Sequence, residues 1–135
     1  LRIYFAASIR GGRDDAPLYR DIIEFLKTKG KVLTEHIGLP SLTAMGEEGK
    51  SDESIYQMDL AWLRTANVVI AEVTTPSLGV GYELGLAEAL GIPILCIYRP
   101  APDRSLSAMI RGNSGITTRD YSTLDEAKAH IETAL

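Results

Sequence analysis

The chain has 135 residues, of which 45% are hydrophobic and 24% are charged. This length and composition predict one globular domain over residues 1–135, with enough apolar residues to bury a core. The formal net charge of −4 argues against a general surface for nucleic acid, because such a surface needs clustered basic residues. A basic pocket for a single phosphate is still compatible with this charge. No apolar run has the length of a membrane span, so we expect no membrane partner.

Cysteine usage indicates a reducing compartment. Cys96 is the only cysteine of the sequence, so no internal disulfide can form. It lies in an apolar run, where we expect a buried, unreactive side chain rather than a nucleophile. The sequence shows no secretory signal peptide. We therefore expect an intracellular protein, located in the cytoplasm, the nucleus or both.

Short apolar segments typical of strands alternate with segments of helical periodicity. In chain order, the sequence predicts strand 2–6, helix 18–29, strand 31–34, helix 52–65, strand 67–73, helix 80–90, strand 92–98, helix 106–111, a weaker strand 115–120 and helix 123–135. We therefore predict an α/β fold: a doubly wound, five-stranded parallel sheet, flavodoxin-like or Rossmann-like, with helices on both faces and strand order 2-1-3-4-5. In this order, ligands bind beyond the carboxyl ends of the first and third strands, where the winding reverses.

The loop after the first predicted strand has the composition of an anion-binding loop. It reads S-I-R-G-G-R over residues 8–13. Glycine lets backbone N–H groups approach a phosphate, the serine hydroxyl adds a donor, and arginine binds phosphate in a fork. The lysine of a P-loop is absent, so a triphosphate with magnesium is not indicated. A glycine turn flanked by solvated arginines is the other interpretation, and the residues alone leave both open.

The loop after the third predicted strand leads into a helix that carries Glu83. Glycines at positions 79, 81 and 85 nearly form a dinucleotide fingerprint, but the last spacing is too long. At helical spacing Glu83 lies beside Val80, Leu84 and Ala87, which we expect to face the sheet. A buried carboxylate is costly unless it is paired or functional, so we interpret Glu83 as a candidate nucleophile. A first-turn glutamate that only complements the helix dipole is the alternative.

A second carboxylate, Asp59, falls in the apolar stripe of the helix predicted over residues 52–65. The stripe is formed by Ile55, Met58, Trp62 and Leu63. Asp59 either caps a neighbouring loop or pairs with Glu83. Paired carboxylates cleave glycosidic bonds, one attacking the anomeric carbon and one handling a proton. A nearby anion also stabilises the oxocarbenium-like transition state of a 2-deoxy sugar.

Tyr4 and His36 complete the candidate residues. Tyr4 lies on the first predicted strand, and its hydroxyl either points to the carboxylates or belongs to the core. His36 follows the second strand; a lone histidine is no metal site, and no metal-ligand spacing occurs in the sequence. We therefore expect no metal and no cofactor. We assign Trp62 to the core rather than to stacking on a base.

Five segments resemble the nucleoside 2-deoxyribosyltransferase superfamily and, within it, the enzymes that hydrolyse 2'-deoxynucleoside 5'-monophosphates. They are Y-F-A-A-S-I-R-G-G-R from Tyr4, T-E-H from Thr34, Q-M-D-L-A-W-L from Gln57, T-T-P-S-L-G-V-G-Y-E-L-G from Thr74 and L-S-A-M-I-R-G from Leu106. The resemblance extends to about Gly112. It implies release of a free base and 2-deoxyribose 5-phosphate through a covalent glycosyl-enzyme intermediate, in a homodimer without metal or cofactor.

The resemblance also implies roles for individual residues. Glu83 matches the nucleophile, Asp59 the partner carboxylate that assists the base and orients the sugar, and Tyr4 a tyrosine that contacts this carboxylate centre. His36 matches a residue that lines the base pocket, and segment 38–51 aligns only loosely with a loop that covers the base. The residues expected to bind the 5'-phosphate are Ser8, Ile9, Arg10, Gly12, Ser77, Gly79 and, from the neighbouring subunit together with Met109, Ser107.

Two other functions share this sequence pattern. A deoxyribosyltransferase would pass the sugar from the same Glu83 intermediate to a second base, but the phosphate loop with Arg10 favours hydrolysis of a monophosphate. A nucleotide-binding module would bind without turnover, and the fold alone does not exclude it. The presence of Asp59 and Glu83 together with the phosphate loop argues against such a module.

Overall fold

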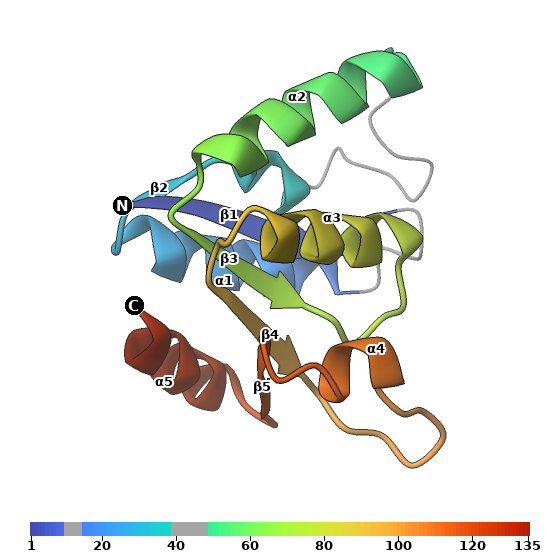
Figure 1. The fold of residues 1–135 in the computed structure, drawn as a ribbon. Coiled ribbons are helices and arrows are strands. Elements are labelled where there is room, and N and C mark those ends of the chain that lie inside the picture. The colour runs from blue at the N-terminus through green and yellow to red at the C-terminus, as the bar shows by residue number, and fades with distance from the viewer. Residues whose placement is uncertain (10–14, 39–48) are drawn as a thin grey trace.

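The computed structural model describes residues 1–9, 15–38 and 49–135 of the chain. Within these residues, strands and helices alternate as the sequence predicts (Figure 1). The strands are β1 (Arg2–Ala7), β2 (Lys31–Val32), β3 (Val68–Glu72), β4 (Ile94–Tyr98) and β5 (Thr117–Asp120). The helices are α1 (Ala16–Lys27), the 3-10 helix η1 (Glu35–Gly38), α2 (Asp52–Thr65), α3 (Leu78–Ala89), α4 (Ala108–Arg111) and α5 (Leu124–Ala134). Among these described helices, none is both long and apolar enough to cross a lipid bilayer.

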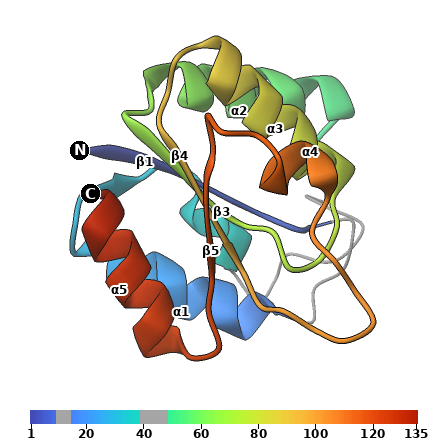
Figure 2. The same ribbon diagram turned by 60° about the horizontal axis from the view of Figure 1, so that its bottom comes forward.

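The strands form one parallel sheet in the order β2-β1-β3-β4-β5, which confirms the predicted doubly wound fold. Helices α2, α3 and α4 lie on one side of the sheet, and α1 and α5 lie on the other (Figure 2). The winding reverses between β1 and β3, where Ala7 is in register with Glu72 at the carboxyl ends. The loops after these two strands therefore leave the sheet next to each other, at the place where this architecture binds ligands.

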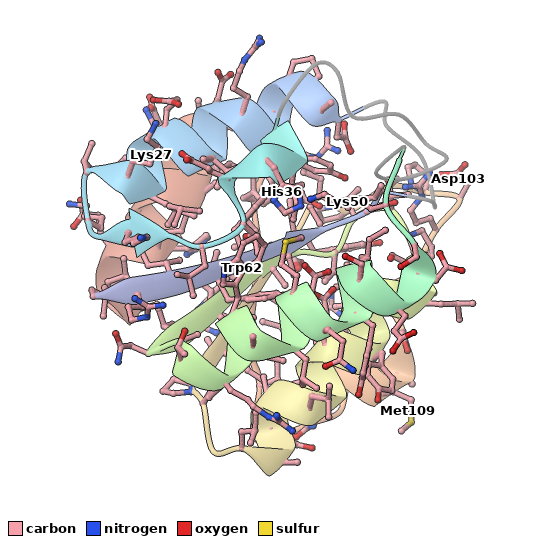
Figure 3. The ribbon with its side chains drawn as sticks, turned by 90° about the horizontal axis from the view of Figure 1, so that it is seen from above. Lys27, His36, Lys50, Trp62, Asp103 and Met109 are labelled. Carbon is pink, nitrogen blue, oxygen red and sulfur yellow. The ribbon has the colours of Figure 1, made fainter. Side chains whose placement is uncertain are left out.

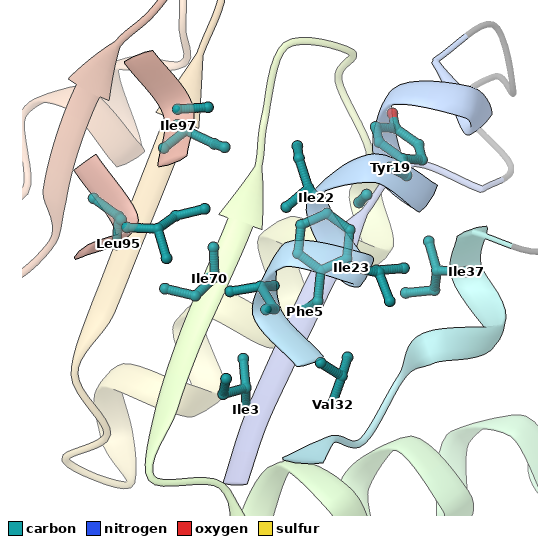
Figure 4. Packing of buried hydrophobic residues seen from close by; sticks show 14 of the residues in the cluster. Ile3, Phe5, Tyr19, Ile22, Ile23, Val32, Ile37, Ile70, Leu95 and Ile97 are labelled. Atoms are coloured by element: carbon teal, nitrogen blue, oxygen red, sulfur yellow. The ribbon is translucent and has the colours of Figure 1, made fainter. Parts of the chain in front are cut away.

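The sheet separates two hydrophobic clusters, because successive side chains of a strand point to opposite faces. On the side of α1 and α5, Phe5, Ile22 and Ile70 pack together in the interior (Figure 4). The cluster beneath α3 contains Tyr4 and Cys96. Burial raises the pKa of the Cys96 thiol to about 12, so this cysteine is a core residue, as expected. Each fully buried large side chain contributes roughly 1.5–3 kcal/mol, and the two clusters together fix the frame that carries the site.

Side-chain hydrogen bonds shift several element ends from the predicted bounds. β2 ends at Val32 rather than Thr34, because the Thr34 hydroxyl bridges to β1 in place of the backbone. This hydroxyl donates to the Phe5 carbonyl at 2.6 Å and accepts from the Phe5 N–H at 3.0 Å. α4 and α5 begin directly after Ser107 and Thr123, whose hydroxyls accept backbone N–H groups as helix caps.

Candidate active site

Tyr4 and Glu83 meet between β1 and α3. The Tyr4 side chain is 1% exposed and packs in the cluster beneath α3. Its hydroxyl donates a hydrogen bond to Oε2 of Glu83. On α3, Glu83 lies between two buried residues, Val80 one turn earlier and Leu84 next to it, as the helical spacing in the sequence predicts. The carboxylate therefore lies half-buried beneath α3 and against the sheet, instead of on the solvent side of the helix.

Asp59 on α2 is the third member of this group, and it acts electrostatically on the other two. Burial raises the pKa of Glu83, the hydrogen bond from Tyr4 lowers it, and the charge of Asp59 raises it again, with a result of about 7. Burial and then the charges of Glu83 and Asp59 raise the pKa of Tyr4, so its phenol stays a hydrogen-bond donor. Near neutral pH the site therefore has a carboxylate balanced between its ionised and protonated forms, beside a second carboxyl group.

These three groups suit the cleavage of a glycosidic bond. An ionised carboxylate can attack an anomeric carbon, and a second carboxyl group can carry the proton that the leaving group takes up. Two carboxyl groups that interact do not ionise independently, so one retains a proton over a wider pH range than an isolated group would. The structure thus brings together Tyr4, Asp59 and Glu83, the residues for which the sequence predicts catalytic roles.

Ser8 lies at the reversal point of the sheet, immediately after β1. It is fully buried, and its Oγ has no hydrogen-bond partner among the described residues. A buried hydroxyl in that condition is uncommon in folded proteins, so the Ser8 hydroxyl is a candidate contact for a ligand. Ile9 is half-buried and packs against the cluster on the α1 side. Arg10 and Gly12 lie outside the described residues.

Ser77 and Gly79 form the start of α3, next to the same reversal point. The Ser77 Oγ accepts the Val80 N–H at 3.2 Å as the helix cap, which leaves its hydroxyl hydrogen available for another acceptor. A Cβ at Gly79 would meet only the Ser77 Oγ, at 3.9 Å, so the described part of the chain leaves this stretch of backbone accessible. Free N–H groups at a helix start favour anions.

His36 and Trp62 face each other across the gap between η1 and α2 (Figure 3). Their ring centroids are 5.6 Å apart, with the planes tilted by 44°. Trp62 packs on the cluster beneath α3, as predicted, but it is only partly buried and its ring also borders His36. Half-buried aromatic rings of this kind offer a flat apolar surface that a nucleobase can contact. The predicted covering loop falls largely on residues 39–48, which lie outside the described residues.

Ser107 and Met109 lie on the opposite flank of α3 from Tyr4 and Glu83. They border a cavity of about 570 Å³ between α3 and the segment around α4, and neither Tyr4 nor Glu83 lines that cavity. Met109 is 83% exposed, and the Ser107 Oγ accepts the Met109 N–H at 3.2 Å. Within one chain, these two residues are therefore not part of the carboxylate group.

Glu72 is a buried acidic residue that the sequence patterns above did not single out. It is the last residue of β3 and is 0% exposed. The signal was present: an ionisable residue interrupts the otherwise apolar run 67–73, and buried charges require a partner. Its partners, Thr74, Arg99 and Tyr121, are distant from one another in the sequence.

The sequence is similar to that of known proteins. Residues 3–131 match the nucleoside 2-deoxyribosyltransferase family. The chain is 54% identical over 134 residues to the 5-hydroxymethyl-dUMP N-hydrolase of Mus musculus, covering 98% of this chain and 76% of that protein. It is 51% identical over 135 residues to the protein of the same name from Danio rerio, covering 98% and 94%.

Among solved structures, the fold resembles the CMP N-glycosidase of Clostridium botulinum, with a TM-score of 0.72, 20% identity and full coverage of both chains. This likeness concerns the fold. The family match spans the sheet from β1 into α5 and includes every described residue of the candidate site. The chain belongs to the nucleoside 2-deoxyribosyltransferase family.

Proposed function

We propose that the protein hydrolyses the N-glycosidic bond of 2'-deoxynucleoside 5'-monophosphates, releasing the free base and 2-deoxyribose 5-phosphate. The observation that carries this proposal is the group formed by Tyr4, Asp59 and Glu83. The same sheet buries the Ser8 hydroxyl, which has no hydrogen-bond partner within residues 1–9, 15–38 and 49–135. The mouse and zebrafish relatives are named for hydrolysis of 5-hydroxymethyl-dUMP, which is a deoxynucleoside monophosphate, and they are 54% and 51% identical to this chain.

In the proposed reaction, ionised Glu83 attacks the anomeric carbon while the bond from that carbon to the base nitrogen breaks. The electron pair of this bond leaves with the base. Water then attacks the anomeric carbon, Glu83 leaves as a carboxylate, and the Asp59 carboxylate accepts the proton released by water and passes it to the base. The hydrogen bond from Tyr4 orients the Glu83 carboxylate throughout, so both half-reactions use one geometry.

The proposal is tested by chromatography of the free base released from matched deoxynucleoside monophosphates, ribonucleoside monophosphates and deoxynucleosides, with wild type and Arg10→Ala. Wild type is expected to release base from the deoxynucleoside monophosphates alone. Because a monophosphate carries roughly two negative charges, loss of Arg10 is expected to raise KM for it by about tenfold or more.

Two results would contradict hydrolysis itself, and a third would contradict the role of Arg10. Absence of base release from every substrate would leave a binding module on the same fold. Transfer of the sugar to an added second base in preference to water would indicate a transferase. An unchanged preference for monophosphates in Arg10→Ala would mean that other residues hold the phosphate.

We also propose that the protein is a homodimer in which Ser107 and Met109 complete the neighbouring subunit's site. The cavity beside α3 is bordered by Leu78, which is 97% exposed, and by Met109. It is also bordered by Gly81 and Gly85, where a Cβ would meet no described atom within 4 Å. Exposed apolar side chains around an open cavity are typical of a subunit interface. A second copy packed there would carry its own Ser107 across α3.

Mixing two inactive variants tests this arrangement. Consider a twofold dimer that contains one Ser107→Ala chain and one Glu83→Ala chain. One of its two sites has both substitutions, and the other has neither. Random exchange of subunits is therefore expected to restore about a quarter of the wild-type activity, whereas each variant alone has a strongly reduced rate. The measurement is base release after exchange, with exchange itself followed by differently tagged chains. Confirmed exchange without any recovery would contradict the shared site.

A further inference from the structure

Helix α2 carries Asp59, but core packing anchors this helix only near its carboxyl end. Of residues 52–65, Leu63 alone is buried, and with Trp62 it belongs to the cluster beneath α3. Helix α1, which is shorter, buries four residues. In Figure 1 the carboxyl end of α2 lies close to the sheet, and its amino end lies farther away. The place of Asp59 therefore depends on contacts of α2 outside the core.

A contact between two exposed tyrosines joins this part of α2 to α3. The rings of Tyr56 on α2 and Tyr82 on α3 meet edge to face, with centroids 6.4 Å apart and planes at 61°. Aromatic rings attract each other in this arrangement and at this distance. The phenols interact as well, because a hydrogen bond with Tyr56 and then the charge of Tyr56 raise the pKa of Tyr82. The two helices are thus joined by a ring pair at the surface.

This ring pair lies beside both carboxylates of the candidate site. Tyr82 directly precedes Glu83 on α3. Tyr56 lies three residues before Asp59, so the two side chains are neighbours on one side of α2. The rings do not act on Glu83 by charge, since the groups that shift its pKa, apart from burial, are Tyr4 and Asp59. An effect of the ring pair on the site is therefore an effect on the distance between the helices.

The proposed reaction depends on the distance between Asp59 and Glu83. The two carboxyl groups of a retaining glycosidase are about 5 Å apart, and a wider gap admits a water molecule between them. Glu83 is held by the Tyr4 hydroxyl and by its buried neighbours Val80 and Leu84. The distance between the carboxyl groups is therefore set by how closely α2 is held against α3.

We infer that Tyr56 and Tyr82 are positioning residues: their ring contact holds α2 against α3 at the separation that the reaction requires between the two carboxylates. They act through Asp59 and Glu83, without touching the reacting atoms. The inference rests on the proposed function, and it assigns a role to two side chains outside the carboxylate group. A displacement of about 1 Å in a positioned group can lower a rate by 10²-fold, so loss of this contact has a measurable effect on kcat.

The test compares Tyr56→Ala and Tyr82→Ala, which remove a ring, with Tyr56→Phe and Tyr82→Phe, which keep it. These side chains are 45% and 57% exposed, so all four variants are expected to fold. Each alanine variant is expected to lower kcat for dUMP by about tenfold, with KM within about threefold, because α2 is held less closely. Each phenylalanine variant keeps the edge-to-face contact, and its kcat is expected to stay within about threefold of wild type.

A readout independent of turnover is the pKa of the Glu83 carboxyl group. It is measured by NMR of protein labelled with ¹³C in its glutamate side chains, and the signal is assigned with Glu83→Gln. Burial and the charge of Asp59 raise this pKa, and both effects weaken when α2 moves away. The alanine variants are therefore expected to titrate Glu83 at lower pH than wild type. The double alanine variant is expected to differ little from either single variant, since each breaks the same contact.

Leu90→Ala is the matched control. It removes an apolar side chain that is 48% exposed at the carboxyl end of α3, about two turns from Glu83. We expect no change in kcat or in the titration of Glu83.

Alanine variants with the kcat and the Glu83 titration of wild type would overturn the inference. So would a lower kcat with an unchanged titration, because the role would then not pass through the spacing of the carboxylates. Phenylalanine variants as slow as the alanine variants would rule out the ring contact as the cause. Failure of the proposed function is a separate result: wild type would then release no base, while the titration would still show whether the ring pair holds Asp59 near Glu83.

Discussion

Glu83→Ala is expected to abolish base release, with kcat lower by roughly 10⁴-fold or more, because the nucleophile of the proposed reaction is removed. The companion variant Glu83→Gln keeps an acceptor for the Tyr4 hydroxyl and is expected to be equally inactive. Agreement between the two would separate loss of the nucleophile from loss of the hydrogen bond. The rate is measured by chromatography of the free base at saturating substrate.

The fold of these variants is expected to remain intact. The pKa of Glu83 is raised to about 7 in the folded protein, above its ordinary value, chiefly by burial. A carboxyl group raised in this way destabilises the fold progressively as pH rises from its ordinary pKa to about 7, because the unfolded chain ionises first, and the full penalty remains at higher pH. Glu83→Gln is therefore expected to have a Tm at pH 8 no lower than that of wild type.

The matched control for this prediction is Glu24→Ala. Glu24 is an exposed glutamate of α1 whose carboxylate pairs with Lys27 on the surface. Its loss is expected to leave kcat and KM unchanged. Near-normal turnover by folded Glu83→Ala would remove Glu83 from the mechanism, whatever the control shows.

Asp59→Asn is expected to lower kcat by roughly 10²-fold, the contribution typical of a positioned general acid or base. It is also expected to shift the pH profile. In the proposed reaction the nucleophile is the ionised form of Glu83, so kcat/KM of wild type is expected to rise with pH through about 7. Burial raises the pKa of Glu83 to this range, the hydrogen bond from Tyr4 lowers it, and the charge of Asp59 raises it again. Because that charge raises the pKa of Glu83, its removal moves the acidic limb to lower pH.

The measurement is kcat/KM for a deoxynucleoside monophosphate between pH 5 and pH 9, a window that spans the ordinary and raised pKa values of a carboxyl group. Asp125→Asn, an exposed aspartate in the first turn of α5, is the control for loss of one negative charge. An acidic limb that stays in place, or moves to higher pH, would show that Asp59 does not act on Glu83 in solution.

The fold was predictable from local sequence patterns, because the spacing of apolar residues within each segment indicates whether it is a strand or a helix. Segments 67–73 and 92–98 are apolar enough to be interior strands, and β3 and β4 are interior in the sheet. The bounds were less predictable, since Thr34 and Ser107 redirect single hydrogen bonds and thereby end or begin an element.

The candidate site was predictable where a charged residue interrupts an apolar pattern. Glu83 and Asp59 stood out in this way, and the structure brings both to Tyr4. The ion pair between Asp15 and Arg99 left no such signal, because the two residues are 84 positions apart. Within its own segment of the sequence, each looks like an ordinary surface charge. Long-range pairing of this kind is decided by the packing of the sheet, which single-segment patterns do not encode.

The most direct test of the central claim is to look for the sugar on Glu83. A deoxynucleoside monophosphate with an electron-withdrawing fluorine at C2' slows both half-reactions, because it destabilises their oxocarbenium-like transition states, and it is expected to let a covalent intermediate accumulate. Mass spectrometry of the intact protein is expected to show one sugar phosphate per chain, located on the peptide that contains Glu83. Stoichiometric release of the base with no gain in protein mass, or with the sugar on another residue, would contradict the account.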